Sequence, residues 1–397
     1  MTERYDILVA GGGVAGLAAA AAFASAGRRV LCVDAAPAEA GLRDTRTTAV
    51  LRPGVDLLTR AGVWARLDGE VAALRTMRLI DAGGPRNRAR EVADFNAEET
   101  AGSDDAPLFG WNAPNAALRR ALRERLDELP GATLRAETAV EGLLARRDEA
   151  VATLTGGETV RARLAIGADG RDSAVRRLAG IEARRWDYGQ KALVFTVAHD
   201  RPHDGVSTEI HRTGGPFTLV PAPDGEDGRP RSSVVWMERA AEADRLAALE
   251  TTGFEAALNA RSLDALGPLT LVSDRAAWPI ISLIAHRLTA PRVALIAEAA
   301  HVVPPIGAQG LNMSLGDVAA LMAATGEGDP GRAEGLARYQ RRWPELAARV
   351  AGVDALNRAA RTDLQPLRDL RRFGLGAISR VTPVRRLAMR LGLGVGA

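Results

Sequence analysis

The chain has 397 residues, of which 47% are hydrophobic and 25% charged, the balance of a soluble globular protein with one to three domains. The net charge is only +3, and the sparse aromatic residues are not interleaved with a basic stripe, so we exclude a nucleic-acid function. An apolar run of about eighteen residues and a signal-peptide pattern are both absent. These absences argue against a spanning helix, and we expect a cytoplasmic location, with peripheral contact to the membrane as an open alternative.

The chain contains one cysteine, Cys32, which cannot form an internal disulfide and therefore suits a reducing compartment. It lies between Leu31 and Val33 in an apolar run. Because free cysteine is usually buried as a small hydrophobic residue, we predict that Cys32 packs in the core and is not reactive.

A glycine turn lies near the N-terminus, between an apolar run at 5–10 and an alanine-rich segment that ends at Gly27. The turn reads Gly11-Gly12-Gly13-Val14-Ala15-Gly16, and a second apolar run after it ends on Asp34. The pattern predicts a strand, a helix and a parallel strand. Glycines at this spacing let a pyrophosphate approach the helix N-terminus, and the acidic residue can accept a ribose hydroxyl, so we predict a dinucleotide site.

A second segment, Gly167-Ala-Asp-Gly-Arg-Asp-Ser-Ala-Val-Arg176, directly follows a predicted strand. Asp169 and Gly170 favour a turn, and Asp172 and Ser173 are predicted to cap a helix. From the residues alone, an ordinary join between a strand and a helix is as good an interpretation as a cofactor site.

A third segment runs from Ala297 to Met313. Glu298 closes a predicted strand, a loop rich in proline and glycine follows, and a new helix is expected to begin near Leu311. The free N–H groups of such a helix start attract an electron-rich group. A second helix start of this kind suits a long cofactor anchored at both ends, such as FAD, whereas NAD alone would not require it.

The rest of the chain predicts a helix over 115–128, two strands over 150–167 and a helical C-terminus. Short β-prone runs over 185–275, separated by turn residues, indicate a mostly antiparallel sheet. The predicted fold class is α/β, a discontinuous Rossmann-like FAD-binding domain with an inserted sheet that binds substrate. The boundaries we predict are 1–75, 105–183 and 276–340 for the FAD-binding domain, 76–104 and 184–275 for the substrate domain, and 341–397 for a C-terminal helical segment.

The three segments, in this order, resemble the class-A FAD monooxygenases, the aromatic hydroxylases that include 4-hydroxybenzoate hydroxylase. Within that class the resemblance is closest to the hydroxylases of ubiquinone biosynthesis, and it spans nearly the whole chain. Further support comes from Asp44-Thr-Arg-Thr-Thr-Ala-Val50, Trp186-Asp-Tyr-Gly-Gln190 and Gly215-Pro-Phe-Thr-Leu-Val-Pro221. The sequence departs from the family at Ala297-Glu298, where a Gly-Asp pair is usual.

The resemblance implies roles for particular residues. The AMP half of FAD would lie against the glycine turn and Asp34, Arg46 near the pyrophosphate and flavin, and Asn115 beside the flavin chain. Asp169 would lie near the pyrophosphate, Glu298 at the ribityl chain or a phosphate, and Pro305 at the hydroxylation site. The complete predicted cofactor set is Gly11, Gly13, Val14, Ala15, Gly16, Asp34, Arg46, Asn115, Asp169, Glu298, Gly310, Leu311 and Asn312.

The mechanism that the resemblance implies has NAD(P)H reduce FAD transiently, O₂ add at the flavin C4a, and the resulting hydroperoxide pass an OH to an electron-rich ring. A second glycine-turn unit for NAD(P)H is absent from the sequence, and the five histidines have no zinc spacing, so we expect no metal. His199 and His203 fall in a polar turn and are predicted to be solvated. For His301 we expect a structural role.

The sequence leaves the identity of the substrate and of any partner undetermined. The leading hypothesis is an aromatic substrate with a polyprenyl tail, and the alternatives are a soluble aromatic metabolite or a non-catalytic flavoprotein subunit of a biosynthetic complex. Trp278-Pro279 either lines the pocket or packs in the core. A basic C-terminal segment is either a surface that contacts anionic lipid or a partner complex, or a packed helix with a solvated face. Its arginines are Arg361, Arg368, Arg371, Arg372, Arg380, Arg385, Arg386 and Arg390.

Overall fold

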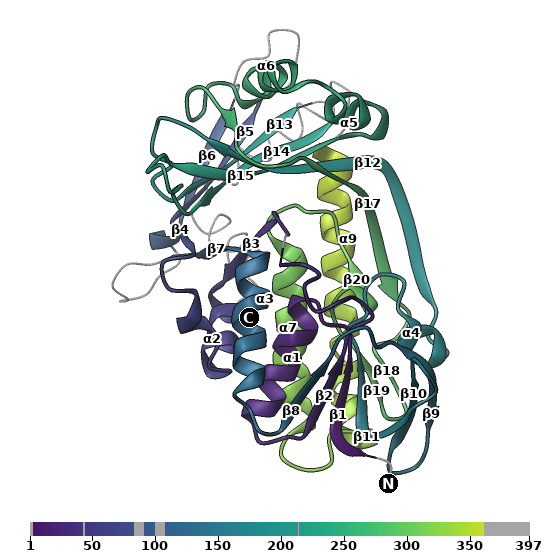
Figure 1. Cartoon of the computed structure of the whole chain (residues 1–397). Helices are drawn as coiled ribbons and strands as arrows, with labels where there is room; N and C mark the ends of the chain where they lie inside the picture. The colour runs from purple at the N-terminus through teal and green to yellow at the C-terminus, as the bar shows by residue number, and fades with distance from the viewer. Residues whose placement is uncertain (1–2, 43, 83–90, 100–107, 213, 361–397) are drawn as a thin grey trace.

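The structure, a computed structural model, describes residues 3–42, 44–82, 91–99, 108–212 and 214–360. Over these ranges the chain has the predicted α/β fold, with two large sheets and a small one (Figure 1). The first large sheet and its helices form the lower half of the view, and the second large sheet with two covering helices forms the upper half.

The first sheet has the strand order β18-β19-β11-β1-β2-β8, with β10 paired to β11 and β9 to β10. Its parallel strands are β1 (Arg4–Ala10), β2 (Val30–Val33), β8 (Ala132–Arg135), β11 (Thr159–Gly167) and β19 (Val293–Leu295). The antiparallel ones are β9 (Val140–Ala145), β10 (Ala150–Leu154) and β18 (Thr289–Ala290). The strands predicted from the apolar runs before and after the glycine turn are therefore confirmed as parallel neighbours.

Helix α1 (Val14–Ser25) directly follows the glycine turn and is buried over nearly its whole length. Its small alanine side chains allow α3 (Asn115–Asp127) and α7 (Gln309–Thr325) to pack closely against it. Burial of apolar surface on all sides, rather than a polar outer face, holds this helix in place. Cys32 lies in the same core, and burial raises the pKa of its thiol to about 12, which confirms the predicted packing role.

The second sheet has the order β20-β17-β12-β15-β14-β13-β5-β6, with β16 paired to β12. Its strands are β5 (Thr76–Asp81), β6 (Glu91–Asn96), β12 (Ala183–Ala198), β13 (Val206–Arg212), β14 (Gly215–Ala222), β15 (Arg231–Arg239), β16 (Thr270–Leu271), β17 (Ala276–Ala285) and β20 (His301–Val302). Helices α5 (Ala240–Ala247) and α6 (Thr251–Ser262) cover one face, where Phe195, Phe217 and Phe254 pack together (Figure 1). The other face is turned towards the first sheet.

Two long strands, β12 and β17, run side by side from one half of the molecule to the other (Figure 1). Helix α9 (Trp343–Ala360) extends upward beside them, and α8 (Ala333–Gln340) precedes it. The small sheet lies between the halves and comprises β3 (Thr47–Leu51), β4 (Ala72–Leu74) and β7 (Gly110–Pro114). Shorter helical elements are α2 (Arg52–Arg60), α4 (Ala174–Leu178), η1 (Trp64–Leu67), η2 (Ala97–Glu99) and η3 (Ala297–Ala299).

The predicted inserted sheet corresponds to β5, β6 and β12 to β16, which are joined by β17 and β20 from the range assigned to the FAD-binding domain. The division into domains stays a prediction. The predicted helical C-terminus is observed up to Ala360, and the arginine-rich segment that begins at Arg361 lies outside the described residues. In the part of the chain that is described, none of the helices combines the length and apolar character that a membrane crossing requires.

One histidine prediction is wrong. His199 is fully buried at the end of β12 and not solvated. Its Nδ1 lies 2.8 Å from the carbonyl oxygen of Arg201, and its Nε2 lies 2.9 Å from the hydroxyl oxygen of Ser232. Both ring nitrogens have partners, so the turn can bury the ring without loss of hydrogen bonds. His203, also predicted to be solvated, is half-buried.

Candidate functional site

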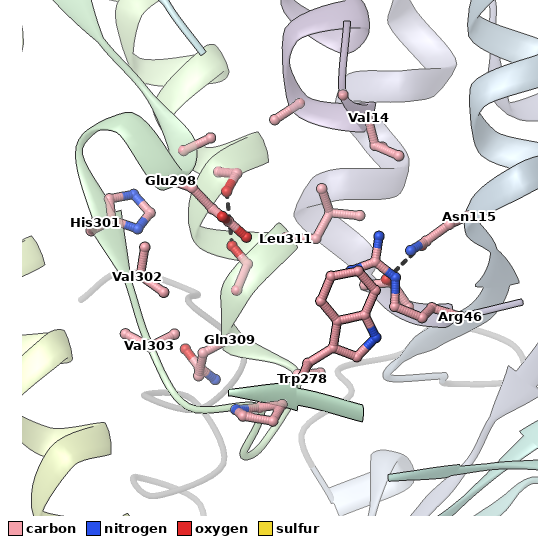
Figure 2. A pocket seen from close by; sticks show the side chains of 18 of the residues that line it. Val14, Arg46, Asn115, Trp278, Glu298, His301, Val302, Val303, Gln309 and Leu311 are labelled. Carbon is pink, nitrogen blue, oxygen red and sulfur yellow. Dashed lines mark hydrogen bonds between the residues drawn. The ribbon is translucent and has the colours of Figure 1, made fainter. Parts of the chain in front are cut away.

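A cavity of about 2380 Å³ lies between the first sheet, the start of α7 and the inner face of the second sheet. The residues predicted to hold the cofactor line this cavity, apart from Asn312, and so does Pro305. The fold therefore brings together segments that are far apart in the chain, such as the turn at Gly11 and the helix start at Gly310. Figure 2 shows Val14, Arg46 and Leu311 projecting into one space.

The glycine turn forms one end of the cavity. Gly11 has φ of +113°, and a Cβ atom there would overlap the carbonyl oxygen of Ala168. A Cβ atom at Gly16 would overlap the carbonyl oxygen of Gly11. At Gly13, by contrast, the nearest atom to such a Cβ is Nη2 of Arg119 at 3.9 Å. The turn is thus tight on its inner side and open where Gly13 borders the cavity.

Helix α1 begins at this open edge, with Gly13 as its N-cap residue and without a side chain that accepts a hydrogen bond from its first turn. Its first turn also lacks acidic residues. The first N–H groups of a helix carry partial positive charge and have no partners within the helix. A cradle of bare N–H groups and absent Cβ atoms fits a pyrophosphate, which is the group that FAD would present here.

Asp34 lies at the carboxyl end of β2 and lines the same part of the cavity. Its Oδ1 accepts a hydrogen bond of 3.2 Å from the backbone N–H of Ala36, which fixes the direction of the carboxylate. The parallel pairing of β1 with β2 places the carboxylate beside the glycine turn. A ribose hydroxyl could therefore donate to this carboxylate.

A polar network borders the middle of the cavity. Nη2 and Nε of Arg46 lie 2.7 Å and 2.8 Å from the carboxylate oxygens of Asp44. Asn115 donates to Asp44 over 3.3 Å and accepts from the hydroxyl of Thr48 over 2.8 Å. Burial opposes the charged form of Asp44, but the bonds from Arg46 outweigh it and hold the pKa of that carboxyl below its usual range. Arg46 and Asn115 are therefore held in fixed positions at the cavity surface, as Figure 2 shows.

Trp278 on β17 stands against this network from the opposite half of the molecule, with the guanidinium carbon of Arg46 4.7 Å from the ring centroid. Its side chain is 41% exposed and lines the cavity. This geometry decides in favour of pocket lining over core packing. The sequence does not indicate that Asp44 and Thr48 are the partners of Arg46 and Asn115, although both lie in the segment from Asp44 to Val50 that supports the resemblance.

Asp169 is used mainly to start a helix. Its Oδ2 accepts from the backbone N–H groups of Ala174 and Val175 over 2.7 Å and 3.0 Å, and its Oδ1 accepts from the Ser173 hydroxyl. Ser173 in turn accepts from the N–H of Arg176 over 2.9 Å, which confirms its predicted capping role.

The capping role predicted for Asp172 is wrong, because its carboxylate pairs with Arg185 at the surface over 2.9 Å. Asp169 lines the cavity, but both its oxygens bond within the chain. Its proximity to a pyrophosphate stays a prediction.

The loop that carries Glu298 is held by a buried carboxylate. Asp317 of α7 accepts from the backbone N–H of Ala297 over 3.0 Å and from Nε2 of His301 over 2.6 Å, and its side chain is fully buried. This contact explains the structural role expected for His301. Ala297 has φ of +55°, a conformation that favours glycine, so the departure from the family pattern carries some backbone strain. Glu298 itself is half-exposed and pairs with Arg171 over 3.3 Å.

Helix α7 presents a second free N-terminus. Ala308 precedes it with φ of +56°, and the structure shows no side-chain cap. Gly310 and Leu311 line the cavity, whereas the side chain of Asn312 turns away and bonds to β3. Its Oδ1 accepts from the N–H of Leu51 over 2.8 Å, and its Nδ2 donates to the carbonyl of Ala49 over 2.7 Å. Asn312 therefore locks the helix start in position, and its backbone belongs to the same first turn.

The motif from Trp186 to Gln190 has a role that the sequence did not indicate. Trp186 donates from Nε1 to Asp354 on α9 over 3.0 Å, and Tyr188 donates its hydroxyl to the same carboxylate. Asn357, also on α9, donates to Gln190 over 3.0 Å. Alternate residues of β12 thus attach α9 along the cavity. Side chains two residues apart on a strand share one face, but the sequence does not show which helix packs against that face.

The comparisons with known proteins agree with this arrangement. The family profile described as "FAD binding domain" matches residues 4–351. The ubiquinone hydroxylase UbiL of Rhodospirillum rubrum is 38% identical over 398 residues, covering 98% of this chain and 89% of the relative. The 3-demethoxyubiquinol 3-hydroxylase of Escherichia coli is 30% identical over 405 residues, covering 99% of each chain.

Among solved structures, PqsL, described as a probable FAD-dependent monooxygenase from Pseudomonas aeruginosa, matches with a TM-score of 0.75 and 25% identity. The match covers 94% of this chain and 100% of that one. In the described part of the chain, no group of three or more His, Cys, Asp or Glu side chains is arranged to hold a metal ion. With its glycine cradle, its second helix start and these relatives, the chain belongs to the FAD-dependent monooxygenases, and FAD is its cofactor.

Proposed function

We propose that this enzyme hydroxylates the aromatic ring of a polyprenylated phenol in ubiquinone biosynthesis, with NAD(P)H as reductant and O₂ as the source of oxygen. The observation that carries the proposal is the continuity of the cavity from the glycine cradle to the inner face of the second sheet, part of which is apolar. The two relatives reported above, whose names describe hydroxylases of ubiquinone or a ubiquinol precursor, support the substrate class.

In this proposal, the glycine turn and Asp34 would hold the adenosine half of FAD. Arg46 and Asn115 would lie along its middle, and the first turn of α7 would face the flavin. When bound, FAD supplies the two-electron chemistry that activates O₂ for transfer of one oxygen atom to the ring. The chain itself orients the ring and keeps water out.

The wall opposite the predicted flavin position suits an apolar ring. Val194, Val235 and Ile280 line it from three neighbouring strands, and Ile306 adds to it from the loop before α7. Apolar side chains at this wall exclude water, which would otherwise compete for the activated oxygen. Pro305, which lines the same cavity, borders the space where the ring would lie.

An apolar surface on helix α9 favours a polyprenylated substrate over a soluble metabolite. Val353 and Leu356 line the cavity, and Leu356 is 60% exposed. A small polar metabolite leaves such a surface in water, whereas an isoprenoid tail that lies along α9 covers it. Burial of this apolar surface contributes a favourable binding free energy of roughly 25 cal/mol per Å². The alternative, a soluble aromatic substrate on the same scaffold, uses the ring site without this surface.

Product analysis tests the proposal. We expect the purified protein to retain FAD, to oxidise NAD(P)H faster when 2-polyprenylphenol is added, and to form a ring-hydroxylated product that mass spectrometry identifies. A matched phenol without the isoprenoid tail should be a poorer substrate. Equal kcat/KM for the two phenols would favour the soluble alternative, and absence of any hydroxylated product with either would contradict the proposal.

A further inference from the structure

An acid–base pair lies on the inner face of the second sheet. Glu209 and His211 are two residues apart on β13, so their side chains point to the same side, and both line the cavity. Ile210 between them points the other way, into the core beneath α5 and α6. Nε2 of His211 lies 2.5 Å from Oε1 of Glu209, and Glu209 is only 7% exposed.

The hydrogen bond between the two side chains fixes which atoms stay available. An ionised carboxylate accepts hydrogen bonds but cannot donate them, so Nε2 of His211 carries the proton and Nδ1 is left as an acceptor. Nδ1 is buried and has no hydrogen-bond partner among the described residues. The Glu209 carboxylate makes its side-chain contact in the described structure through Oε1, so the pair as a whole has unused acceptor capacity.

The surroundings make this pair unusual. Thr218 faces Glu209 from β14, and Val220 and Val235 continue the wall. Asp81, opposite His211 on the neighbouring β5 and also buried, is the other titratable residue from the flanking strands that lines this part of the cavity within the described ranges. A charged pair with a spare acceptor is costly on such a wall unless a ligand donates a hydrogen bond to it.

We propose that the Glu209–His211 pair binds the hydroxyl of the phenolic substrate and accepts its proton during hydroxylation. The inference rests on the proposed function. As the ring carbon forms its bond to the incoming oxygen, the phenol O–H bond breaks, its proton moves to Nδ1 of His211 and its electron pair moves into the ring. The ring carbon then loses its hydrogen as a proton, the ring becomes aromatic again, and the pair returns its proton to the phenolic oxygen. The second oxygen atom leaves as water, with two electrons from NAD(P)H.

The experiment compares Glu209→Gln, His211→Asn and the wild type, each as the full FAD-loaded chain. The probes are 2-prenylphenol and its methyl ether 2-prenylanisole, which lacks the O–H group. The control is His286→Asn, because His286 also pairs with a glutamate, Glu182 at 3.7 Å, but lies on the surface.

For the two test variants we expect kcat with 2-prenylphenol to fall by about 100-fold, in the range of general acid–base catalysis. We expect kcat to depend less on pH in both variants than in the wild type, because the variants lack the group that accepts the proton. Wild type should bind 2-prenylphenol about tenfold more tightly than 2-prenylanisole, since a hydrogen bond to a charged group is lost in the ether. The variants should lose this preference at unchanged FAD content, and the control should match wild type in every measurement.

Two results are distinguishable. If wild type hydroxylates 2-prenylphenol but both variants keep its pH profile and its preference over the ether, the pair has no part in recognition or proton transfer and the inference fails. If FAD-loaded wild type forms no hydroxylated product, the proposed function fails instead. In that case the binding preference still decides whether the pair recognises a phenolic hydroxyl, because that measurement does not depend on turnover.

Discussion

The two ends of the cavity are built from different materials. The end at which we propose that FAD binds, called the cofactor end, consists largely of backbone, namely the glycine turn from Gly11 to Gly16 and the first turns of α1 and α7. The end at which we propose that the aromatic ring binds, called the substrate end, is a sheet whose alternate side chains face inward, among them Glu209, Val220 and Val235. A backbone site requires glycine at fixed positions, so it leaves a motif in the sequence. A side-chain wall requires only alternation, so it leaves none that identifies a ligand.

Asp317 is an exception to the contrast between a backbone site and a side-chain site. At the cofactor end, its side chain holds the loop that carries Glu298. Asp317→Ala should lower the free energy of unfolding by about 3–5 kcal/mol, the usual cost of removing one member of a buried pair. Chemical denaturation measures this loss. Asp244→Ala, which removes a half-exposed salt bridge to Lys191, is the matched control and should lower it by less than about 1 kcal/mol. Equal losses in the two variants would show that the buried contact does not hold the loop.

Gly16→Ala tests the backbone character of the cofactor end directly. The added methyl would overlap the carbonyl oxygen of Gly11, and such overpacking costs about 1–3 kcal/mol or somewhat more. We expect the dissociation constant for FAD, measured by flavin fluorescence, to rise by about 100-fold. Gly253→Ala in α6, where the nearest atoms are 3.9 Å away, should leave it unchanged. Normal FAD affinity in the first variant would show that the turn can relax around a side chain.

Asp34→Ala removes a side chain from the cofactor end and leaves the glycine turn intact. If the carboxylate accepts a ribose hydroxyl, FAD should bind about 10- to 100-fold more weakly, because a hydrogen bond to a charged group contributes about 1.5–3 kcal/mol. Asp34→Asn should restore part of the affinity. Isothermal titration with the apoprotein measures both, and unchanged affinity in the alanine variant would remove Asp34 from the site.

Asp354 joins the two halves through α9, and its contribution should depend on pH. Burial opposes its charge, but hydrogen bonds from Tyr188, Arg358 and Trp186 outweigh that effect and hold its pKa below the usual range. A lowered folded-state pKa stabilises the protein above the unfolded pKa of about 3.9, and the stabilisation disappears as the pH falls through the folded value.

Asp354→Asn should therefore lower the free energy of unfolding at pH 7 by about 1–2 kcal/mol, with a smaller difference from wild type as the pH falls below about 4. Denaturant titrations at several pH values check this. A difference that stays constant down to the acid limit would mean that the charge of Asp354 is not what the hydrogen bonds stabilise.

Trp278→Ala should have the smallest effect of the series. The ring packs against Arg46 at the cavity surface, and such a partly exposed contact contributes about 0.5–1 kcal/mol. We expect KM for the aromatic substrate to rise by about threefold to fivefold with FAD content unchanged. Trp278→Phe keeps an aromatic face and should recover most of the loss. A large fall in FAD content would place Trp278 at the cofactor end instead.

The sequence by itself predicted the cofactor end and determined the elements that build it. Its requirements are local and can be recognised from their positions in the chain. They are glycines where a Cβ atom would clash, alanines that let α1 pack closely, and an acidic residue at the end of β2. The strands on either side of the turn followed from short apolar runs, the helix between them followed from its alanine content, and the α/β class followed from their order. The cap at Ser173 was equally local, although the same reasoning chose Asp172 wrongly, because its surface partner Arg185 is distant in the sequence.

Only the tertiary structure decided which side chains meet across the molecule. Trp278 reaches Arg46 because β17 crosses from one half to the other, and Asp317 reaches His301 because α7 packs beneath the loop. His199 is buried because Ser232 on the neighbouring strand completes its hydrogen bonds. Glu209 and His211 are candidates for substrate binding only because the tertiary structure turns their face of β13 towards the cavity. Alternation predicts that two faces exist, but packing alone decides which of them covers the core and which one meets a substrate.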